Sequence, residues 1–441
     1  MTTTIRYLMM LLLFVMPLTG ASADTKEDVL KPYEGPSVKG VDPSTLTGKV
    51  MTGYQGWFTC PGDGADLGWT HWGTNRGSRF EPGHLTVDLW PDVSEYDDDE
   101  LYVTPFFQVD GSPAKVFSSH NRKTVIRHFR WMRDYGIDGA FVQRFSYSLH
   151  REKSKYHKDK VLSCAREGAN RYGRTYAVMY DLTSMPDDKI ITVFDDWKIL
   201  CEDMHITKDP AYQHHNGQPL VAIWGVGFNH QIKRRAGLDV CKELIQTFKT
   251  NGYSVMLGIP TGWRAQVRDA LEDPQLHQML LMADVLSPWS VGRFGDIPGL
   301  KDHSAKYWRD DVRWARDKHI DYMPVVFPGF SWHNMKGDKL DKIPRLQGQF
   351  LWSQIVANKK AGADMLYIAM FDEVDEATAI FKCTNNPPTG NGTKFLTYEG
   401  LPSDFYLQLA GQAGKLLRNE MPISDNIPVK ATNLKGYNHV P

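Results

Sequence analysis

The sequence is poor in cysteine and contains no long run of basic residues. Its five cysteines are widely spaced, include no C-x-x-C pair and do not follow a zinc-ligand spacing, so a structural zinc site is not expected. At most two disulfides can form, and free buried thiols are an equal alternative. Basic and acidic residues nearly balance, at 51 and 52, which argues against nucleic acid and anionic membranes as partners. No metal ion or cofactor is expected.

Long apolar runs are missing beyond the N-terminus, so the mature chain is not expected to span a membrane. At the N-terminus, Arg6 precedes the apolar stretch Tyr7–Leu18, and Ala21-Ser22-Ala23 follows it. A basic residue, a short apolar core and small residues at the cleavage position are typical of a secretory signal peptide. We therefore expect residues 1–23 to be removed and the protein to be exported, either to the periplasm or out of the cell. An uncleaved membrane anchor is the alternative.

Between an irregular N-terminal arm (24–46) and a C-terminal tail (421–441), strand-like and helix-like segments alternate. Eight short runs are rich in apolar, β-branched or aromatic residues, namely Val50–Phe58, Gly139–Phe145, Thr175–Leu182, Leu220–Val226, Ser254–Ile259, Asp284–Trp289, Tyr322–Phe327 and Met365–Phe371. Segments of helical periodicity lie between and after them, at Lys123–Tyr135, Val161–Tyr172, Asp187–His205, Leu238–Asn251, Ser304–Lys318, Arg345–Ala361 and Asp404–Arg418. This alternation predicts an α/β fold with parallel strands. Eight such units most simply close into a (β/α)8 TIM barrel over residues 47–420.

A glycine-rich phosphate loop is also missing. An open, doubly wound sheet, the alternative to the barrel, usually carries G-x-G-x-x-G after its first strand, and Gly53–Trp57 does not fit that pattern. The segment Thr59–Lys115 fits no βα unit and contains the apolar run Leu101–Val109 before a Gly-Ser-Pro turn. We interpret it as a long insertion between the first strand and the first helix, with its own hairpin. Because it leaves the C-terminal end of a barrel strand, it is expected to wall the substrate cleft.

Functional side chains of barrels lie at the C-terminal ends of the strands and in the loops that follow. Aromatic rings recur at these positions, and flat rings with nearby polar groups suit the apolar face and hydroxyl edge of a sugar. The residues expected to bind a carbohydrate substrate are Tyr54, Trp57, Tyr180, Asp181, Trp224, Trp289, Trp332 and His333 from the strand ends, with His71 and Trp72 from the insertion. Filling the top of the barrel core is the alternative role for the individual tryptophans.

The sharpest signal is a cluster of four acids at the end of the eighth strand. Asp372, Glu373, Asp375 and Glu376 lie within five residues. Glycoside hydrolysis needs two carboxyl groups, one protonated and one ionised, and acids crowded at the mouth of a pocket push each other's pKa values apart. Glu373 and Glu376 share a face if the chain turns here, so they are the predicted catalytic pair. Asp372 and Asp375 are expected to contact substrate, and a solvated acidic loop is the alternative.

The two ends of the predicted barrel resemble a known group of enzymes. Tyr54-Gln55-Gly56-Trp57-Phe58 followed by Trp69-Thr70-His71-Trp72 looks like the opening of the clan that joins glycoside hydrolase families 71 and 99, and Gly136-Ile137-Asp138-Gly139 resembles its second strand entry. Phe371-Asp372-Glu373-Val374-Asp375-Glu376-Ala377-Thr378 resembles the family 99 closing motif Phe-Asn-Glu-Trp-His-Glu-Gly-Thr. The likeness runs in order from about residue 49 to 418 and is specific in the first and last strands.

The resemblance implies a retaining glycosidase with no cofactor. Family 99 contains endo-α-1,2-mannosidases and mannanases, and family 71 acts on α-1,3-glucan. By the match, Glu373 acts as base on the substrate's own 2-hydroxyl group, and Glu376 protonates the leaving oxygen. The replacement of the motif's Trp by Val374 and of its His by Asp375 alters the surface that contacts sugar, so mannose specificity does not carry over.

The predicted function is therefore an exported glycoside hydrolase that acts on an α-linked poly- or oligosaccharide. Two alternatives stay open from the sequence: a catalytically silent carbohydrate-binding barrel and a metal-assisted barrel hydrolase. The sugar, its linkage, endo or exo action and the oligomeric state are not determined by the sequence.

Overall fold

The computed structural model describes residues 29–229, 236–390 and 392–429. All eight predicted strand runs form strands at or near the expected positions. They are β1 (Val50–Tyr54), β4 (Gly139–Phe145), β5 (Thr175–Asp181), β7 (Gln218–Trp224), β8 (Ser254–Ile259), β9 (Val285–Pro288), the pair β10 (Asp321–Tyr322) and β11 (Val325–Val326), and β12 (Leu366–Ile368). Except at the first residues of β7 and β10 and at the exits of β4 and β7, their side chains are buried on both faces, as in a parallel sheet covered by helices.

The sheet closes into a ring at its seventh strand, which consists of β10 and β11. Neighbouring strands are parallel in the order β10-β9-β8-β7-β5-β4-β1-β12-β11, and the two ends of this path are separated only by Met323 and Pro324. The Met323 N–H donates to Leu286 on one side (2.9 Å), and the Pro324 carbonyl accepts from Tyr367 on the other (3.1 Å). Proline has no N–H for a ladder, so the seventh strand is split into two short pieces. The predicted (β/α)8 barrel is confirmed.

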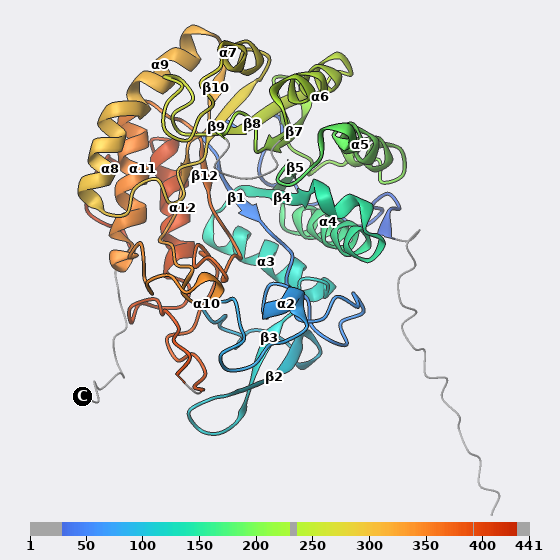
Figure 1. Cartoon of the computed structure of the whole chain (residues 1–441), viewed down its shortest axis with the longest axis vertical. Helices are drawn as coiled ribbons and strands as arrows, with labels where there is room; N and C mark the ends of the chain where they lie inside the picture. The colour runs from blue at the N-terminus through green and yellow to red at the C-terminus, as the bar shows by residue number, and fades with distance from the viewer. Residues whose placement is uncertain (1–28, 230–235, 391, 430–441) are drawn as a thin grey trace, which may run out of the picture.

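Helices surround the strands (Figure 1). The longer ones are α3 (Arg122–Tyr135), α4 (Glu152–Tyr172), α5 (Thr192–Glu202), α6 (Leu238–Thr250), α9 (Arg309–Asp317), α11 (Gln349–Ala361) and α12 (Phe405–Leu417). The shorter elements are α2 (Thr74–Gly77), α7 (Pro274–Leu280), α8 (Ile297–His303), α10 (His333–Lys336) and the two-residue β6 (His214–His215), which pairs antiparallel with β7.

The helix predictions were incomplete at several places, including α8, which lies before the predicted helix start at Ser304. Helix α4 starts at Glu152 rather than Val161, because its first turns are polar and lack the apolar periodicity used to find it. Helix α7 was not expected, since seven residues are too few for a periodic signal; it begins at an Asp273 cap with Pro274 in its first turn. Gly136 does end α3 in the left-handed conformation, with a φ of 77°, as its position predicted.

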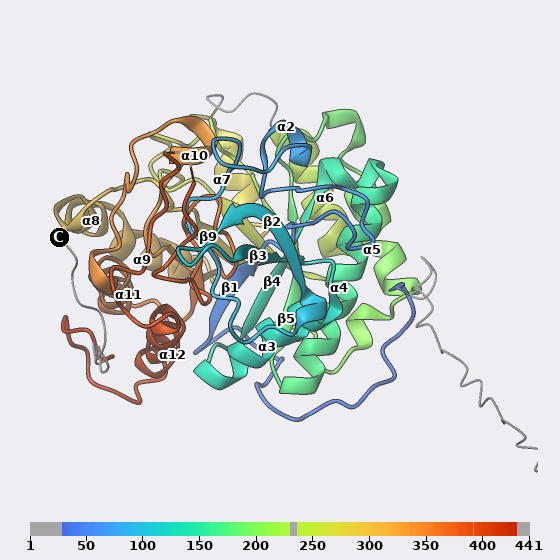
Figure 2. The same cartoon turned by 90° about the horizontal axis from the view of Figure 1, so that it is seen from below.

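The segment after β1 is the expected insertion with its own hairpin. Strands β2 (Leu101–Phe107) and β3 (Pro113–Phe117) pair antiparallel, with Leu101 opposite Phe117. Figure 1 places this hairpin and α2 beyond the tip of β1, and Figure 2, seen from that side, shows the hairpin in front of the barrel strands. Rings of Trp72, Phe80, Trp90, Phe106 and Phe117 pack against one another inside the insertion, which gives it a small core of its own.

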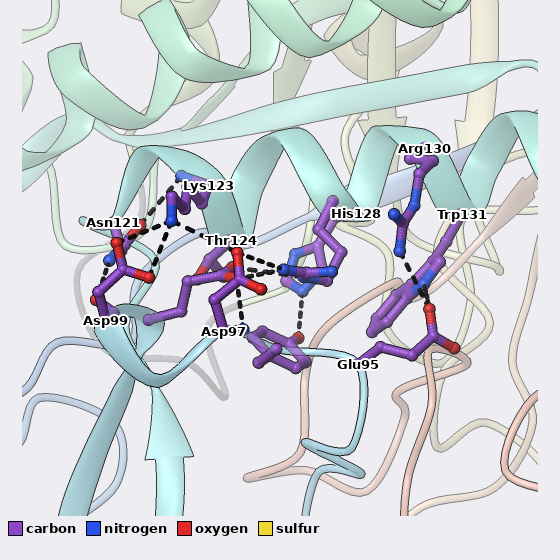
Figure 3. A network of polar contacts seen from close by, with 12 residues as sticks. Glu95, Asp97, Asp99, Asn121, Lys123, Thr124, His128, Arg130 and Trp131 are labelled. Carbon is purple, nitrogen blue, oxygen red and sulfur yellow. Dashed lines mark hydrogen bonds and ion pairs between the residues drawn. The ribbon is translucent and has the colours of Figure 1, made fainter.

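Helix α3 holds the insertion against the barrel. Figure 3 shows the acidic segment with Glu95, Asp97 and Asp99 lying along this helix. Glu100 at its end is fully buried; its carboxylate pairs with Arg127 and accepts from Thr124 Oγ1 at 3.3 Å. Loss of the Glu100–Arg127 ion pair is therefore expected to destabilise the contact between the insertion and α3.

At the centre of the same contact, His128 bridges the barrel and the insertion. Its two ring nitrogens lie 2.8 Å from the hydroxyl groups of Tyr54 in β1 and Tyr96 in the insertion. Burial lowers the pKa of His128 to about 3, so the ring is neutral and one tyrosine donates while the other accepts.

The N-terminal arm lies against the opposite end of the barrel. The N–H groups of Val38 and Val41 donate to carbonyls of Asn170 (2.8 Å) and Gly173 (3.0 Å), just before β5, and buried Lys49 donates to two carbonyls of the arm. The proposed signal peptide, residues 1–23, and the end of the tail lie outside the described residues. Within the residues described, no helix has the length and apolar character needed to cross a membrane.

We expect Arg127→Met to lower the free energy of unfolding by about 3 kcal/mol or more, because it leaves the buried Glu100 carboxylate without its partner. Urea unfolding followed by circular dichroism measures the change. Lys123→Met, on the same helix, is the matched control: Lys123 pairs with exposed Asp97 and Asp99, and exposed pairs contribute little. Equal losses in the two variants would contradict this account.

Candidate active site

A tight turn follows β12 and carries the four acids. The strand ends at Ile368, three residues earlier than expected, and the N–H groups of Thr378 (3.1 Å) and Ala379 (3.0 Å) both donate to the Glu373 carbonyl. The chain therefore turns back at this point, as the sequence predicted. The turn brings Glu373 and Glu376 to the wall of one cavity.

The cavity has a volume of about 570 Å³ and opens at the C-terminal ends of the strands. Its walls are mainly aromatic and apolar, with a few polar groups. The lining side chains are Gln55, Trp57, His71, Gln143, Phe145, Tyr147, Met179, Asp181, Thr183, Ser184, Trp224, Phe228, Trp289, Val291, Arg293, Phe330, Trp332, Lys342, Ile343, Met370, Glu373 and Glu376. Such a mixture of flat rings and few polar groups is usual for a small-molecule or sugar site.

Glu373 is held by two hydrogen-bond donors. The amide Nε2 of Gln55 donates to its Oε1 at 2.8 Å, and the hydroxyl of Thr378 donates to its Oε2 at 2.6 Å. Only 4% of the residue is exposed. Burial, followed by the charges of Glu376 and Asp375, raises the pKa of Glu373 well above its usual value, while the Thr378 hydrogen bond opposes this rise.

Glu376 lies on the same cavity wall but is half-buried rather than buried. Burial and the neighbouring Asp375 raise the pKa of Glu376 to about 8, opposed by the indole of Trp332 and the charge of Lys336. Two nearby carboxyl groups with raised pKa values titrate as a coupled pair. The pair therefore holds at least one proton at neutral pH.

Asp375 points away from the cavity toward the insertion. Its Oδ2 lies 2.8 Å from Nδ1 of His71, and the His71 ring stacks on Trp57 with centroids 3.7 Å apart and planes 2° from parallel. Burial lowers the pKa of His71 to about 3 and raises that of Asp375 well above its usual value. The prediction that Asp375 contacts substrate is not supported, because its carboxyl is used to hold His71, which does line the cavity.

The carboxylate of Asp372 contacts the protein backbone rather than the cavity. Its two carboxylate oxygens accept the backbone N–H groups of Gln55 and Gly56, both at 2.8 Å. Burial raises the pKa of Asp372 to about 6, opposed by these hydrogen bonds and by the charge of Lys158. Its expected contact with substrate is therefore corrected to an anchoring contact with the end of β1.

Of the remaining predicted substrate contacts, six side chains line the cavity: Trp57, His71, Asp181, Trp224, Trp289 and Trp332. Four do not. Tyr54 and Tyr180 point outward from their strands, to His128 (2.8 Å) and to Asp196 (2.7 Å), because successive side chains of a strand face opposite sides. Trp72 is fully buried in the core of the insertion. The His333 ring faces the Asp338 carbonyl at 2.8 Å.

Several lining residues were not among the predicted substrate contacts. Gln55 and Gln143 lie at strand ends, and this position alone could have indicated them. Phe330 and Ile343 come from the long connection after the seventh strand position, and they are held together by backbone hydrogen bonds at 3.0 and 2.9 Å. No local pattern marks such loop residues as part of a site, since their placement depends on contacts between segments.

No protein-family model and no curated protein matches the sequence. Among solved structures, a GH99 endo-alpha-mannosidase from Bacteroides thetaiotaomicron in complex with Bis-Tris propane matches with a TM-score of 0.60 and 16% identity, over 85% of this chain and 99% of that chain. A second structure of a GH99 endo-alpha-mannosidase from this organism gives 0.58 and 16% over the same shares.

A third structure, described as a glycoside hydrolase-like protein, matches with a TM-score of 0.51 and 14% identity over 88% of this chain and 98% of that chain. The chain thus has a glycoside-hydrolase-like barrel fold. The resemblance to family 99 seen in the end motifs extends to the fold of nearly the whole barrel.

The raised pKa of Glu376 predicts a pH-dependent cost to stability. Its pKa is about 8 in the folded protein and near 4.5 ordinarily, so the folded state holds an extra proton between these values. Stability is then lost as pH rises through this window. We expect Glu376→Gln to stabilise the protein on the order of 2 kcal/mol at about pH 8.5 and little at about pH 4.

Thermal unfolding at the two pH values measures this difference. Glu202→Gln, at the exposed end of α5, is the control and should show no such pH-dependent gain. A gain in the Glu376 variant that is the same at both pH values would rule out titration of Glu376 as its origin.

Proposed function

We propose that this protein is a glycoside hydrolase that cleaves an α-linked oligo- or polysaccharide, with Glu373 and Glu376 as the catalytic pair. One observation carries the proposal: two carboxyl groups on one turn, one buried and one half-buried, share the wall of an aromatic-lined cavity at the C-terminal face of a barrel. Hydrolysis of a glycosidic bond requires such a pair, in opposite protonation states.

Glu376 is proposed as the acid. Its pKa of about 8 keeps it protonated at neutral pH, so it can give a proton to the leaving oxygen as the bond to the anomeric carbon breaks. Once ionised, it can take a proton from the water that enters in the second half of the reaction. The raised pKa thus suits both steps.

Glu373 is proposed as the base, following the family 99 resemblance. It removes the proton of the substrate's 2-hydroxyl group, whose oxygen attacks the anomeric carbon and displaces the leaving oxygen. The product of this step is a 1,2-anhydro sugar. Water then attacks the anomeric carbon, Glu376 accepts the water's proton, and Glu373 returns its proton to the 2-oxygen. Two inversions give overall retention of configuration.

The cavity favours a carbohydrate substrate, without fixing which sugar it takes. Trp57, Trp224, Trp289 and Trp332 supply flat faces for sugar rings, and Asp181 adds a third carboxyl for hydroxyl groups. Val374, which replaces the tryptophan of the family 99 motif, is fully buried. The turn therefore offers no aromatic surface of its own here, and the substrate is not proposed to be a mannoside.

We further propose that the protein is exported, on the signal-peptide pattern of residues 1–23. Cleavage after Ala23 and a mature chain that starts near Asp24 are expected from the small residues at positions 21–23. N-terminal sequencing of the protein recovered from outside the cytoplasm tests this proposal.

We expect turnover on one or more α-linked glycans, and a loss of at least about 10²–10⁴-fold in kcat in both Glu373→Gln and Glu376→Gln, because each removes one half of the acid–base pair. Hydrolysis of a panel of α-linked glycans by the purified protein is the measurement. NMR of the first-formed anomer then checks retention of configuration. Glu399→Gln, at an exposed glutamate that does not line the cavity, is the control.

The roles are separated by leaving-group dependence. In an aryl α-glycoside of a strongly acidic phenol, the phenolate leaves without being protonated. Glu376→Gln should therefore recover much of its rate on this substrate, while Glu373→Gln should not. Turnover that survives both substitutions would refute the pair. Glycan binding without turnover in the unaltered protein would favour a silent carbohydrate-binding barrel, and loss of turnover on chelation a metal-assisted hydrolase.

A further inference from the structure

We infer that Gln55 is a positioning residue that places the shared proton of the carboxyl pair on Glu376 and keeps Glu373 ionised. The inference rests on the proposed function for its catalytic meaning, but the geometry that supports it concerns the protein alone. Gln55 stands directly after β1, which is hydrogen-bonded to β12 beside it in the barrel. It reaches Glu373 across a sequence separation of 318 residues.

The main chain of Gln55 is fixed by two side chains from other elements. Its N–H donates to Asp372 Oδ1 at 2.8 Å, and its carbonyl accepts from the buried Lys158 ammonium of α4 at 3.1 Å. Gly56, which donates to Asp372 Oδ2, has a φ of 53°, and a Cβ there would lie 2.5 Å from Val161. With its backbone held in this way, the Gln55 side chain has little freedom to leave Glu373.

The donors to Glu373 favour its ionised form. Gln55 Nε2 and the Thr378 hydroxyl each donate to a different oxygen of the carboxylate, and hydrogen bonds to a charged form lower its pKa. The neighbours that favour ionisation of Glu376 are the indole of Trp332 and the charge of Lys336. Because one proton must be shared between two close carboxyl groups, we infer that Glu373, whose two oxygens each accept a hydrogen bond, gives it up.

The amide oxygen of Gln55, Oε1, links the orientation of the amide to the protonation state of Glu373. Gln55 Oε1 is buried and has no hydrogen-bond partner among the described residues. If Glu373 were protonated, the amide could turn over so that Oε1 accepts from the carboxyl, and Nε2 would then lose its acceptor. The present orientation, with Nε2 toward Glu373, is the one that stabilises the ionised carboxylate.

Other titratable groups face this arrangement and remain unchanged in the test. From the turn itself they are Glu376, Asp375 and Asp372; from β12, Tyr367; and, through Asp375 and Asp372, His71 of the insertion and Lys158 of α4. None of these donates a hydrogen bond to Glu373 in the described residues, so the loss of the Gln55 donor acts on Glu373 directly.

The test is a carboxyl ¹³C NMR titration of glutamate-labelled protein, with the Glu373 signal assigned by its absence in Glu373→Gln. Gln55→Met replaces the amide by an apolar chain of similar length. We expect the pKa of Glu373 to rise by about one unit or more, equivalent to about a tenfold change in its ionisation constant. Gln143→Met is the matched control, because Gln143 also lines the cavity but its amide donates to Tyr367 at 3.0 Å.

If Gln55→Met does not fold, Thr378→Val removes the other donor and should raise the same pKa. With a substrate in hand, the acid limb of kcat/KM should move to higher pH by the same amount, with kcat recovered above it; a merely structural defect would lower kcat at every pH. An unchanged Glu373 pKa in Gln55→Met, or an equal shift in Gln143→Met, overturns the inference. The titration needs no substrate, so its outcome is independent of whether the proposed hydrolysis is found.

Discussion

Four carboxyl groups occupy one turn after the last barrel strand, and the burial of this turn governs the arrangement around it. A buried charge is tolerated only when it is paired or hydrogen-bonded, and otherwise the group keeps its proton. Asp372 meets this demand with two backbone N–H groups and Glu373 with a side-chain amide and a hydroxyl, whereas Asp375, beside the neutral His71 ring, has a pKa raised well above its usual value. The pKa of Glu376 is raised to about 8, and that of Glu373 is also raised well above its usual value. The unequal support gives chemically distinct roles to acids that are neighbours in the sequence.

The partners of these acids come mostly from the start of the chain. Strand β1 lies beside β12 in the closed ring, so the residues just after β1 and the insertion that follows are adjacent to the turn. Asp88 of the insertion also accepts the N–H groups of His333 and Asn334, at 2.7 and 2.8 Å, after the seventh strand position. The insertion is thus a structural part of the site, and its attachment to α3 through buried Glu100 supports the site from a distance.

The departures from the family 99 motif have physical explanations in the fold. Where the motif has asparagine, Asp372 brings a negative charge, and the charge of buried Lys158 partly offsets it. Val374 has its side chain in the core, while its carbonyl accepts from Asp88 and Leu89, at 3.0 and 3.2 Å. Asp375 is tied to His71. The altered residues contact the turn on the side away from the cavity. The two glutamates retained from the motif are the ones that line the cavity.

The sequence by itself determined the number and order of the barrel strands, the insertion and the region of the site, because periodicity and strand ends are local properties. It could not decide which acids face the cavity: Asp372 and Glu373 are adjacent in the chain, and only the geometry of the turn directs one to β1 and the other to the cavity. It also could not reveal the outward direction of Tyr54 and Tyr180, which depends on the register of each strand in the ring. The pairing of Gln55 with Glu373 was settled by barrel closure, since a contact between the two ends of a long chain has no local signature.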